Sequence, residues 1–188
     1  MFHGVPLSFA FDDMSHLHGL AERIHNAADD LPLTNSRYAR SDNLDELDER
    51  VVDITGLFVH LATAAAFADR MARRNRGQET DVTRRKFTGL THAAGTLGRA
   101  LADLGEAVAQ AGLLRQLSGL PGSPERADAA RAARTTVDVR IDSARRHLNE
   151  AGRQLHHDAD QLTRRTPQAA TARVTPLPAV PSPTTRTR

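Results

Sequence analysis

The sequence lacks the residues on which several kinds of chemistry depend. Among its 188 residues there is no cysteine and no tryptophan, one tyrosine and a single lysine, Lys86. Without cysteine the chain has no disulfide scaffold, no thiol nucleophile and no cysteine-based zinc site. Aromatic residues make up 4% of the chain and hydrophobic residues 39%. Any folded core must therefore be built mainly from aliphatic side chains.

The common catalytic sequence motifs are also absent. The sequence contains no glycine-rich phosphate loop ending in lysine, no dinucleotide-binding fingerprint, no nucleophile elbow and no His-Glu-x-x-His motif. We therefore expect a protein that is not an enzyme and that uses no cofactor.

Nine histidines are the remaining candidates for metal binding. Two sets are close enough in sequence to form a surface site: His16, His18 and His25, or His156, His157 and Asp160. Glu22 and His25 have the one-turn spacing of a di-iron ligand pair, but a di-iron bundle needs a second Glu-x-x-His and the chain has none. We predict that the protein has no metal centre.

Neither a membrane span nor a secretory signal is evident. The longest apolar run without a charged residue covers residues 54–68, or 15 residues, which is fewer than the roughly 20 that a membrane-spanning helix needs. Residues 1–11 lack the basic residues that open a secretory signal. We expect a cytoplasmic protein.

Apolar spacing predicts a first long helix from about Asn43, with Asn43 as its N-terminal cap. Apolar residues recur there at gaps of three and four: Leu44, Leu47, Val51, Ile54, Phe58, Leu61, Ala65, Ala68 and Ala72. This heptad-like stripe over about 30 residues is typical of a coiled-coil or bundle helix.

A second long helix is predicted from about Thr80 to Leu120, where a Pro-Gly pair follows. Three glycines, Gly98, Gly105 and Gly112, recur every seven residues along it. Each costs about 1 kcal/mol relative to alanine inside a helix. We therefore expect close packing of a neighbouring backbone along this row, the alternative being that the row has no structural meaning.

A third long helix is predicted from Pro124, with Ser123 as its cap, to about Arg165. Its stripe comprises Val137, Ile141, Ala144, Leu148, Ala151, Leu155 and Leu162. Residues 135–141 are rich in β-branched side chains, so a strand is the alternative there. A position inside a long helical pattern favours the helix.

Together these patterns predict an all-α protein. A shorter helix is expected at about 12–30, and short links make the three long helices antiparallel neighbours. The expected architecture is an up-down antiparallel helical bundle of residues 12–165, after a flexible N-terminus of residues 1–11. Residues 166–188 hold five of the nine prolines and no acidic residue, so we predict a disordered, basic C-terminal tail.

The bundle should have one acidic end, at residues 42–53, and one basic end. The basic residues expected at that end are Arg73, Arg74, Arg76, Arg84, Arg85, Lys86, Arg164 and Arg165. Helix dipoles favour acids at a helix start and bases at its finish, but they disfavour the Arg84–Lys86 cluster near a helix start. These residues are therefore candidates for binding nucleic acid or an acidic partner.

We expect a non-enzymatic helical-bundle protein that acts as an adaptor or structural component through its surfaces, with a protein partner or self-association. The alternative is a sequence-nonspecific nucleic-acid-binding accessory protein that uses the basic end and the tail. A membrane surface is the third partner considered.

Overall fold

The computed structural model describes residues 8–32, 42–74 and 81–165, and within them it forms four α-helices and no strand. The helices are α1 (Ser8–Asp29), α2 (Asp42–Arg74), α3 (Asp81–Ser118) and α4 (Pro124–Arg165). The all-α prediction is confirmed. The predicted tail at 166–188 lies outside the described residues, as do Arg76 and the side chains of Arg164 and Arg165.

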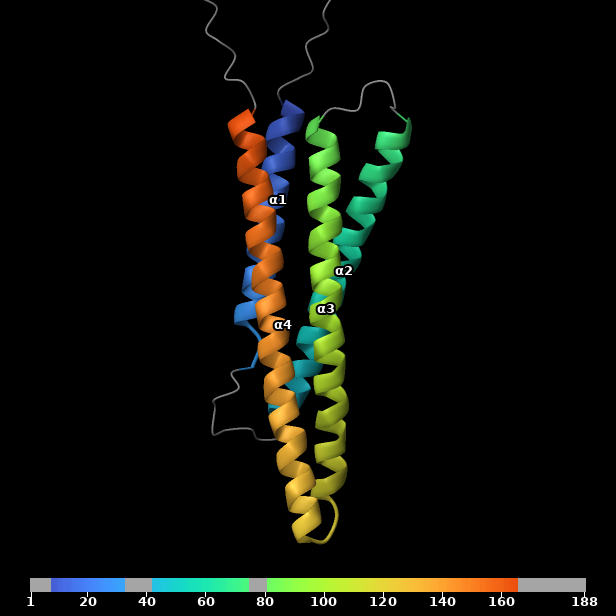
Figure 1. The fold of residues 1–188 in the computed structure, drawn as a ribbon, viewed down its shortest axis with the longest axis vertical. Helices are drawn as coiled ribbons and strands as arrows, with labels where there is room; N and C mark the ends of the chain where they lie inside the picture. The colour runs from blue at the N-terminus through green and yellow to red at the C-terminus, as the bar shows by residue number, and fades with distance from the viewer. Residues whose placement is uncertain (1–7, 33–41, 75–80, 166–188) are drawn as a thin grey trace, which may run out of the picture.

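The helices form an up-down bundle, as predicted. Figure 1 shows α3 and α4 as a long antiparallel hairpin, with α1 along one side of it and α2 along the other. Contacts between α3 and α4 are the most extensive, and α1 packs mainly on α4 and α2 mainly on α3. Among the described residues α1 and α2 touch only slightly, and α2 makes no such contact with α4.

The helix ends follow their local sequence with two small differences. Ser123 caps α4, because its Oγ accepts a hydrogen bond from the backbone N–H of Arg126 at 3.3 Å. In contrast, α2 begins at Asp42, one residue before the predicted cap, and α1 begins at Ser8, inside the segment expected to be flexible. Residues 135–141 are helical, so the strand alternative for them is wrong.

The core is made mainly of leucine and alanine, in keeping with the composition. The predicted stripes of the first and third long helices supply Ile54, Leu61, Leu148 and Leu155, which are among the largest fully buried side chains, and α3 adds Leu97 and Leu104. The N-terminal helix adds Leu17, Leu20, Ile24 and Ala28. Burying each large aliphatic side chain contributes about 1.5–3 kcal/mol, so α1 is an integral part of the core.

The prediction of close backbone packing at the glycine row is wrong. A Cβ added at Gly105 or Gly112 would meet no atom within 4 Å, and one at Gly98 would meet only the Phe58 side chain, at 3.7 Å. The row runs along a part of α3 that no neighbouring backbone covers. The close approaches lie at two other glycines: Gly89 lies against the Asp158 side chain and Gly152 against the His25 ring.

The acidic segment does not lie at an end of the molecule. Figure 1 shows that α2 begins partway along the bundle, because the α3–α4 hairpin extends well beyond it. The acidic start of α2 therefore lies on the flank of the bundle. The expected acidic end is corrected to an acidic flank.

Candidate interaction surfaces

One side of α2 is exposed along most of its length although it is largely apolar. We call this set of residues the outer face of α2: Val52, Gly56, Val59, Thr63, Ala66, Phe67 and Arg70, all of them exposed. Val52 is 70%, Val59 55% and Phe67 61% exposed. Large apolar side chains at this spacing form a continuous stripe on a helix, so the outer face is a second stripe opposite the buried one.

By length and composition, the stretch Glu46–Met71 of α2 is apolar enough to cross a membrane. This finding differs from the expectation based on the longest run without a charged residue, which is only 15 residues long. Only 22% of the apolar window is buried within the bundle. A helix that serves only as a core element hides most of such a window, and α2 does not.

Opposite charges flank the apolar stripe of α2. At its start Glu46, Asp48 and Glu49 are exposed. At its finish Arg73 and Arg74 are exposed, and Arg73 Nε lies 3.0 Å from Asp69 Oδ2 one turn earlier. Both charge groups complement the helix dipole. They also give α2 one acidic and one basic extremity.

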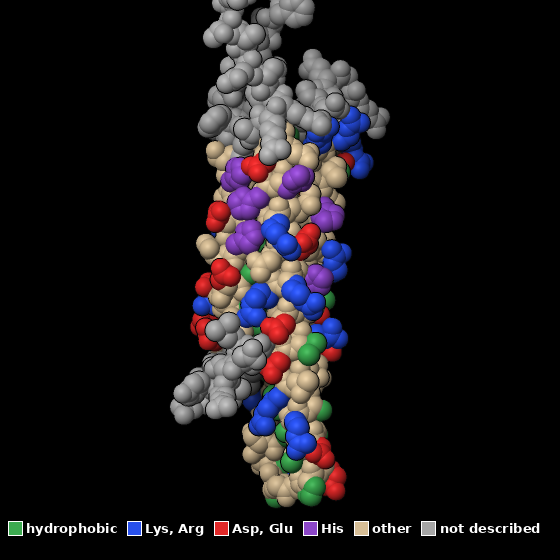
Figure 2. All heavy atoms as spheres, turned by 60° about the vertical axis from the view of Figure 1, so that its left-hand side comes forward, with side chains coloured by type: hydrophobic (Ala, Val, Ile, Leu, Met, Phe, Trp, Pro, Cys, Tyr) green, Lys and Arg blue, Asp and Glu red, His purple; other side chains and the backbone are tan. Residues whose placement is uncertain are grey.

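The predicted basic residues that the structure describes lie where the sequence placed them. Arg73 and Arg74 at the end of α2 and Arg84–Lys86 at the start of α3 share one end of the bundle (Figure 1), and Lys and Arg side chains gather there in Figure 2. Arg84 is exposed, whereas Arg85 and Lys86 are half-buried.

A small groove between α3 and α4 adjoins this basic end. It encloses about 260 Å³ and is lined by Arg85, Lys86, Gly89, His92, Gln154 and Asp158 among others. Asp158 Oδ1 accepts a hydrogen bond from Gln154 Nε2 at 3.0 Å, and the buried Oδ2 has no hydrogen-bond partner among the described residues. Asp158 interrupts the apolar stripe of α4, and Gly89 leaves the space that its side chain fills.

A histidine cluster joins α1 to α4. His18 Nδ1 lies 3.0 Å from His156 Nδ1, and carboxylates flank the pair, with Asp160 Oδ1 3.6 Å from His18 Nε2 and Glu22 Oε1 3.3 Å from His156 Nε2. The His25 ring stacks on His156 at a centroid distance of 5.4 Å. Figure 2 shows histidines gathered on this face of the molecule.

The cluster combines members of both predicted histidine sets and leaves others out. His16 packs edge-on against His60 of α2 at 5.6 Å, and His157 contacts Gln161 of its own helix at 2.7 Å. Within the described ranges no group of three or more His, Asp or Glu residues is arranged to hold a metal ion. A hydrogen bond between two Nδ1 atoms requires that one of them carries a proton and the other does not. The His18–His156 hydrogen bond joins α1 to α4, and we call it the histidine clasp.

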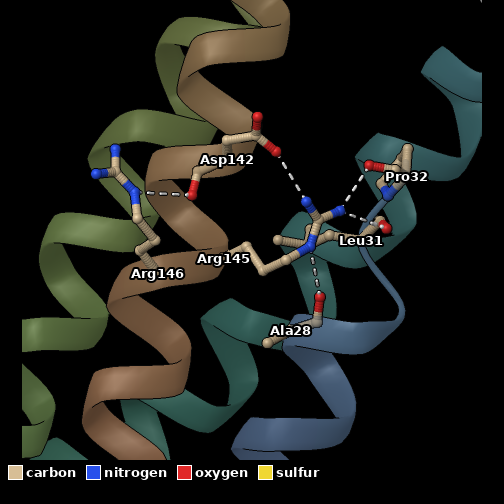
Figure 3. Close-up of polar contacts among 6 residues, drawn as sticks. All are labelled: Ala28, Leu31, Pro32, Asp142, Arg145 and Arg146. Carbon is tan, nitrogen blue, oxygen red and sulfur yellow. Dashed lines mark hydrogen bonds and ion pairs between the residues drawn. The ribbon is translucent and has the colours of Figure 1, made fainter. Parts of the chain in front are cut away.

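Arg145 of α4 holds the end of α1 (Figure 3). Its Nε donates to the Ala28 carbonyl at 3.3 Å, and Nη2 donates to the carbonyls of Leu31 and Pro32 at 3.0 and 2.8 Å. Asp142 accepts from Nη1 at 2.9 Å. The last carbonyls of a helix have no partner within it, so one guanidinium satisfies carbonyls at and just beyond the end of α1. No sequence signal distinguishes this arginine from its neighbours.

Two carboxyl groups on α4 have shifted pKa values. The backbone N–H of Glu125 and the hydroxyl of Ser123 donate to the Glu125 carboxylate and lower its pKa. Partial burial, with a smaller contribution from the neighbouring Asp142 carboxylate, raises the pKa of Asp138. The first shift belongs to the start of a capped helix, and the second belongs to a partly buried carboxylate that lies near another carboxylate.

Comparison of the chain with protein-family models, with curated proteins and with solved structures gave no match.

Proposed function

We propose that this protein is a non-enzymatic helical bundle that works as an interaction or structural component, and that the outer face of α2 is its binding surface. The observation that supports the proposal is the exposure of Val52, Val59 and Phe67 on a helix whose apolar window is only 22% buried. Contiguous apolar surface of this kind typically marks an interaction site.

The shape of the surface also suits a helical partner. The outer face has the three- and four-residue spacing with which one helix packs on another. Gly56, Thr63 and Ala66 lie between the larger side chains, and small residues at a helix surface let a second helix approach closely.

Photo-crosslinking in cells tests the proposal. A photo-reactive residue replaces Val59 in one variant and Val139 of α4 in the matched control, because both side chains are 55% exposed. We expect discrete protein adducts from position 59 and none from position 139. Equal labelling at both positions, or no adduct at position 59, would overturn the proposal.

A second candidate function is sequence-nonspecific binding of nucleic acid at the basic end. It is supported by the position of Arg84–Lys86 at the start of α3, beside Arg73 and Arg74. Positive charge is unfavourable at a helix start, and an anionic partner would offset that cost. Guanidinium groups match phosphate oxygens well.

Fluorescence anisotropy with duplex and single-stranded DNA over a salt series tests this candidate. We expect affinity to fall steeply with salt, as for any phosphate-dominated interface. Arg85→Glu with Lys86→Glu should abolish binding, whereas Arg131→Glu with Arg134→Glu, in exposed positions near the opposite end of α4, should have little effect. Equal losses from both pairs would show that only overall charge matters.

A further inference from the structure

Six of the seven residues of the outer face of α2 lie symmetrically in sequence about Leu61; the exception is Phe67, which has Thr55 at the matching position. Val52, Gly56 and Val59 precede that point at the same distances at which Arg70, Ala66 and Thr63 follow it. The charges are opposite rather than equal at the two extremities, with Asp48 and Glu49 before the stripe and Arg73 and Arg74 after it. A helix with this pattern is complementary to a second copy of itself running in the opposite direction.

We infer that α2 pairs antiparallel with α2 of a second copy of this chain, through their outer faces. The inference rests on the proposed function, since it names the partner of the same surface. About a two-fold axis at position 61, Val59 of one copy faces Thr63 of the other, and Gly56 faces Ala66. Such an isologous contact closes at two copies, as in most homodimers.

The charges select the antiparallel orientation. In that register the acidic start of each α2, with Asp48 and Glu49, lies beside the basic finish of the other, with Arg73 and Arg74, and the two-fold axis repeats this contact. In a parallel pair, acids would face acids and arginines would face arginines. Like charges across an interface oppose association, whereas opposite charges fix register and orientation.

The bundle leaves room for the second copy. α2 packs on α3, touches α1 only slightly, and its backbone does not come close to that of α4 among the described residues. Figure 1 shows its finishing half leaning outward from the other helices. From Asp48 to Arg74 the helix is about 40 Å long at 1.5 Å per residue, so a partner helix lies along the whole stripe and reaches both charged extremities.

Disulfide trapping tests the register, because the native chain has no cysteine. Val52→Cys and Arg70→Cys lie about 27 Å apart on one helix at 1.5 Å per residue, too far for a bond within the chain. The variant that carries both should form a covalent dimer rapidly under mild oxidation. Each single variant should do so no faster than Val139→Cys, which reports random collisions. Rapid dimerisation of Val52→Cys alone would indicate a parallel pair and overturn the inference.

Sedimentation of the full chain at micromolar concentration tests the association itself. We expect a dimer for the native chain and a monomer for Val59→Glu with Phe67→Glu, while Val139→Glu remains dimeric and all variants keep the native helical circular dichroism. Asp48→Arg with Glu49→Arg should weaken the dimer at least tenfold. Adding Arg73→Glu and Arg74→Glu to that variant restores opposite charges at each extremity and should restore the dimer.

The outcomes separate this inference from the proposed function. A monomeric native chain whose photo-reactive residue at position 59 labels a different protein would overturn the dimer and leave the binding surface in place. A monomeric chain that labels nothing would remove both. Co-sedimentation with anionic phospholipid vesicles that is lost in Val59→Glu with Phe67→Glu would assign the surface to lipid and likewise overturn the dimer.

Discussion

The two helices that flank the α3–α4 hairpin are held in different ways. α1 lies on α4 with its apolar side buried, and polar contacts fix its position: the His18–His156 clasp near its middle and Arg145 at its end. α2 lies on α3, also buries an apolar stripe, and leaves a second apolar stripe in contact with solvent. The apolar side of α1 is covered by its own chain, whereas α2 has apolar residues on two opposite sides and only one of these sides is covered.

This difference shows that directional polar contacts and apolar contacts have different roles in the bundle. Hydrogen bonds and ion pairs demand particular geometry, so they hold α1 in one register on α4. Apolar stripes are less selective and accept any surface of suitable shape. α2 is held mainly by such stripes, with one ion pair between Arg50 and Asp30 at 3.6 Å and the ring contact between His60 and His16. A helix held in this way is suited to meet a partner outside its own chain.

The largest expected effect comes from removing apolar volume on the two sides. Ile24 of α1 is fully buried, so Ile24→Ala should lower the free energy of unfolding by about 2–5 kcal/mol, through lost burial and the cavity left behind. Val59→Ala on the outer face should change it by less than about 0.5 kcal/mol at a protein concentration where the chain is monomeric. Chemical denaturation measures both, and equal losses would contradict the contrast between the two helices.

The next largest effect concerns the polar hold on α1. Arg145→Ala removes donors from the carbonyls of Ala28, Leu31 and Pro32, and we expect a loss of roughly 1–3 kcal/mol. Arg146 is the matched control, since it is exposed and its Nε donates to the Asp142 carbonyl of its own helix at 3.4 Å. Hydrogen exchange should show faster opening of the end of α1 in the first variant and not in the second. Similar exchange in both would mean that Arg145 does not hold α1.

Periodicity predicted the helices and the buried stripes because both depend on positions along one segment. Ile54, Leu61 and Leu148 were assigned to the core from spacing alone, and all three are fully buried. Val52, Val59 and Phe67 have a similar spacing on the opposite side of the same helix. The outer face of α2 could therefore have been found from the sequence.

The contacts between helices could not be predicted, because they depend on how far one helix slides along another. His18 and His156 are 138 positions apart, and only the stagger of α1 on α4 brings their Nδ1 atoms together. The prediction of close packing at Gly98, Gly105 and Gly112 was wrong for the same reason. Gly105 has the regular spacing of a packing site, but no neighbour reaches it, whereas Gly152 belongs to no row and lies under the His25 ring.

A smaller effect is expected from the histidine clasp. His156→Ala removes the partner of His18 and of Glu22 and should cost about 1 kcal/mol. His157→Ala, one position along and exposed, is the control. Nitrogen-15 NMR of the imidazoles gives a readout beyond stability, since the His18 resonances should shift in the first variant and stay in place in the second. Unchanged His18 resonances in His156→Ala would show that the two rings do not share a proton.

The smallest expected effect comes from Asp138 and gives the scale of a single surface charge against which the contacts of α1 can be judged. Its raised pKa means that the folded state binds the proton more tightly than the unfolded chain does. Stability therefore falls as the pH rises from the ordinary carboxyl pKa through the raised one, and the charged form remains unfavourable at neutral pH.

Asp138→Asn should stabilise the protein at pH 7 by less than about 0.5 kcal/mol, because the group is largely solvated. Below the ordinary carboxyl pKa both forms are neutral and the gain should disappear. Denaturation curves for the native chain and the variant at pH 7 and at about pH 3.5 measure this difference, with Asp128→Asn, at an exposed position on the same helix, as the control. A gain that persists unchanged at the lower pH would show that the amide stabilises α4 for a reason other than charge.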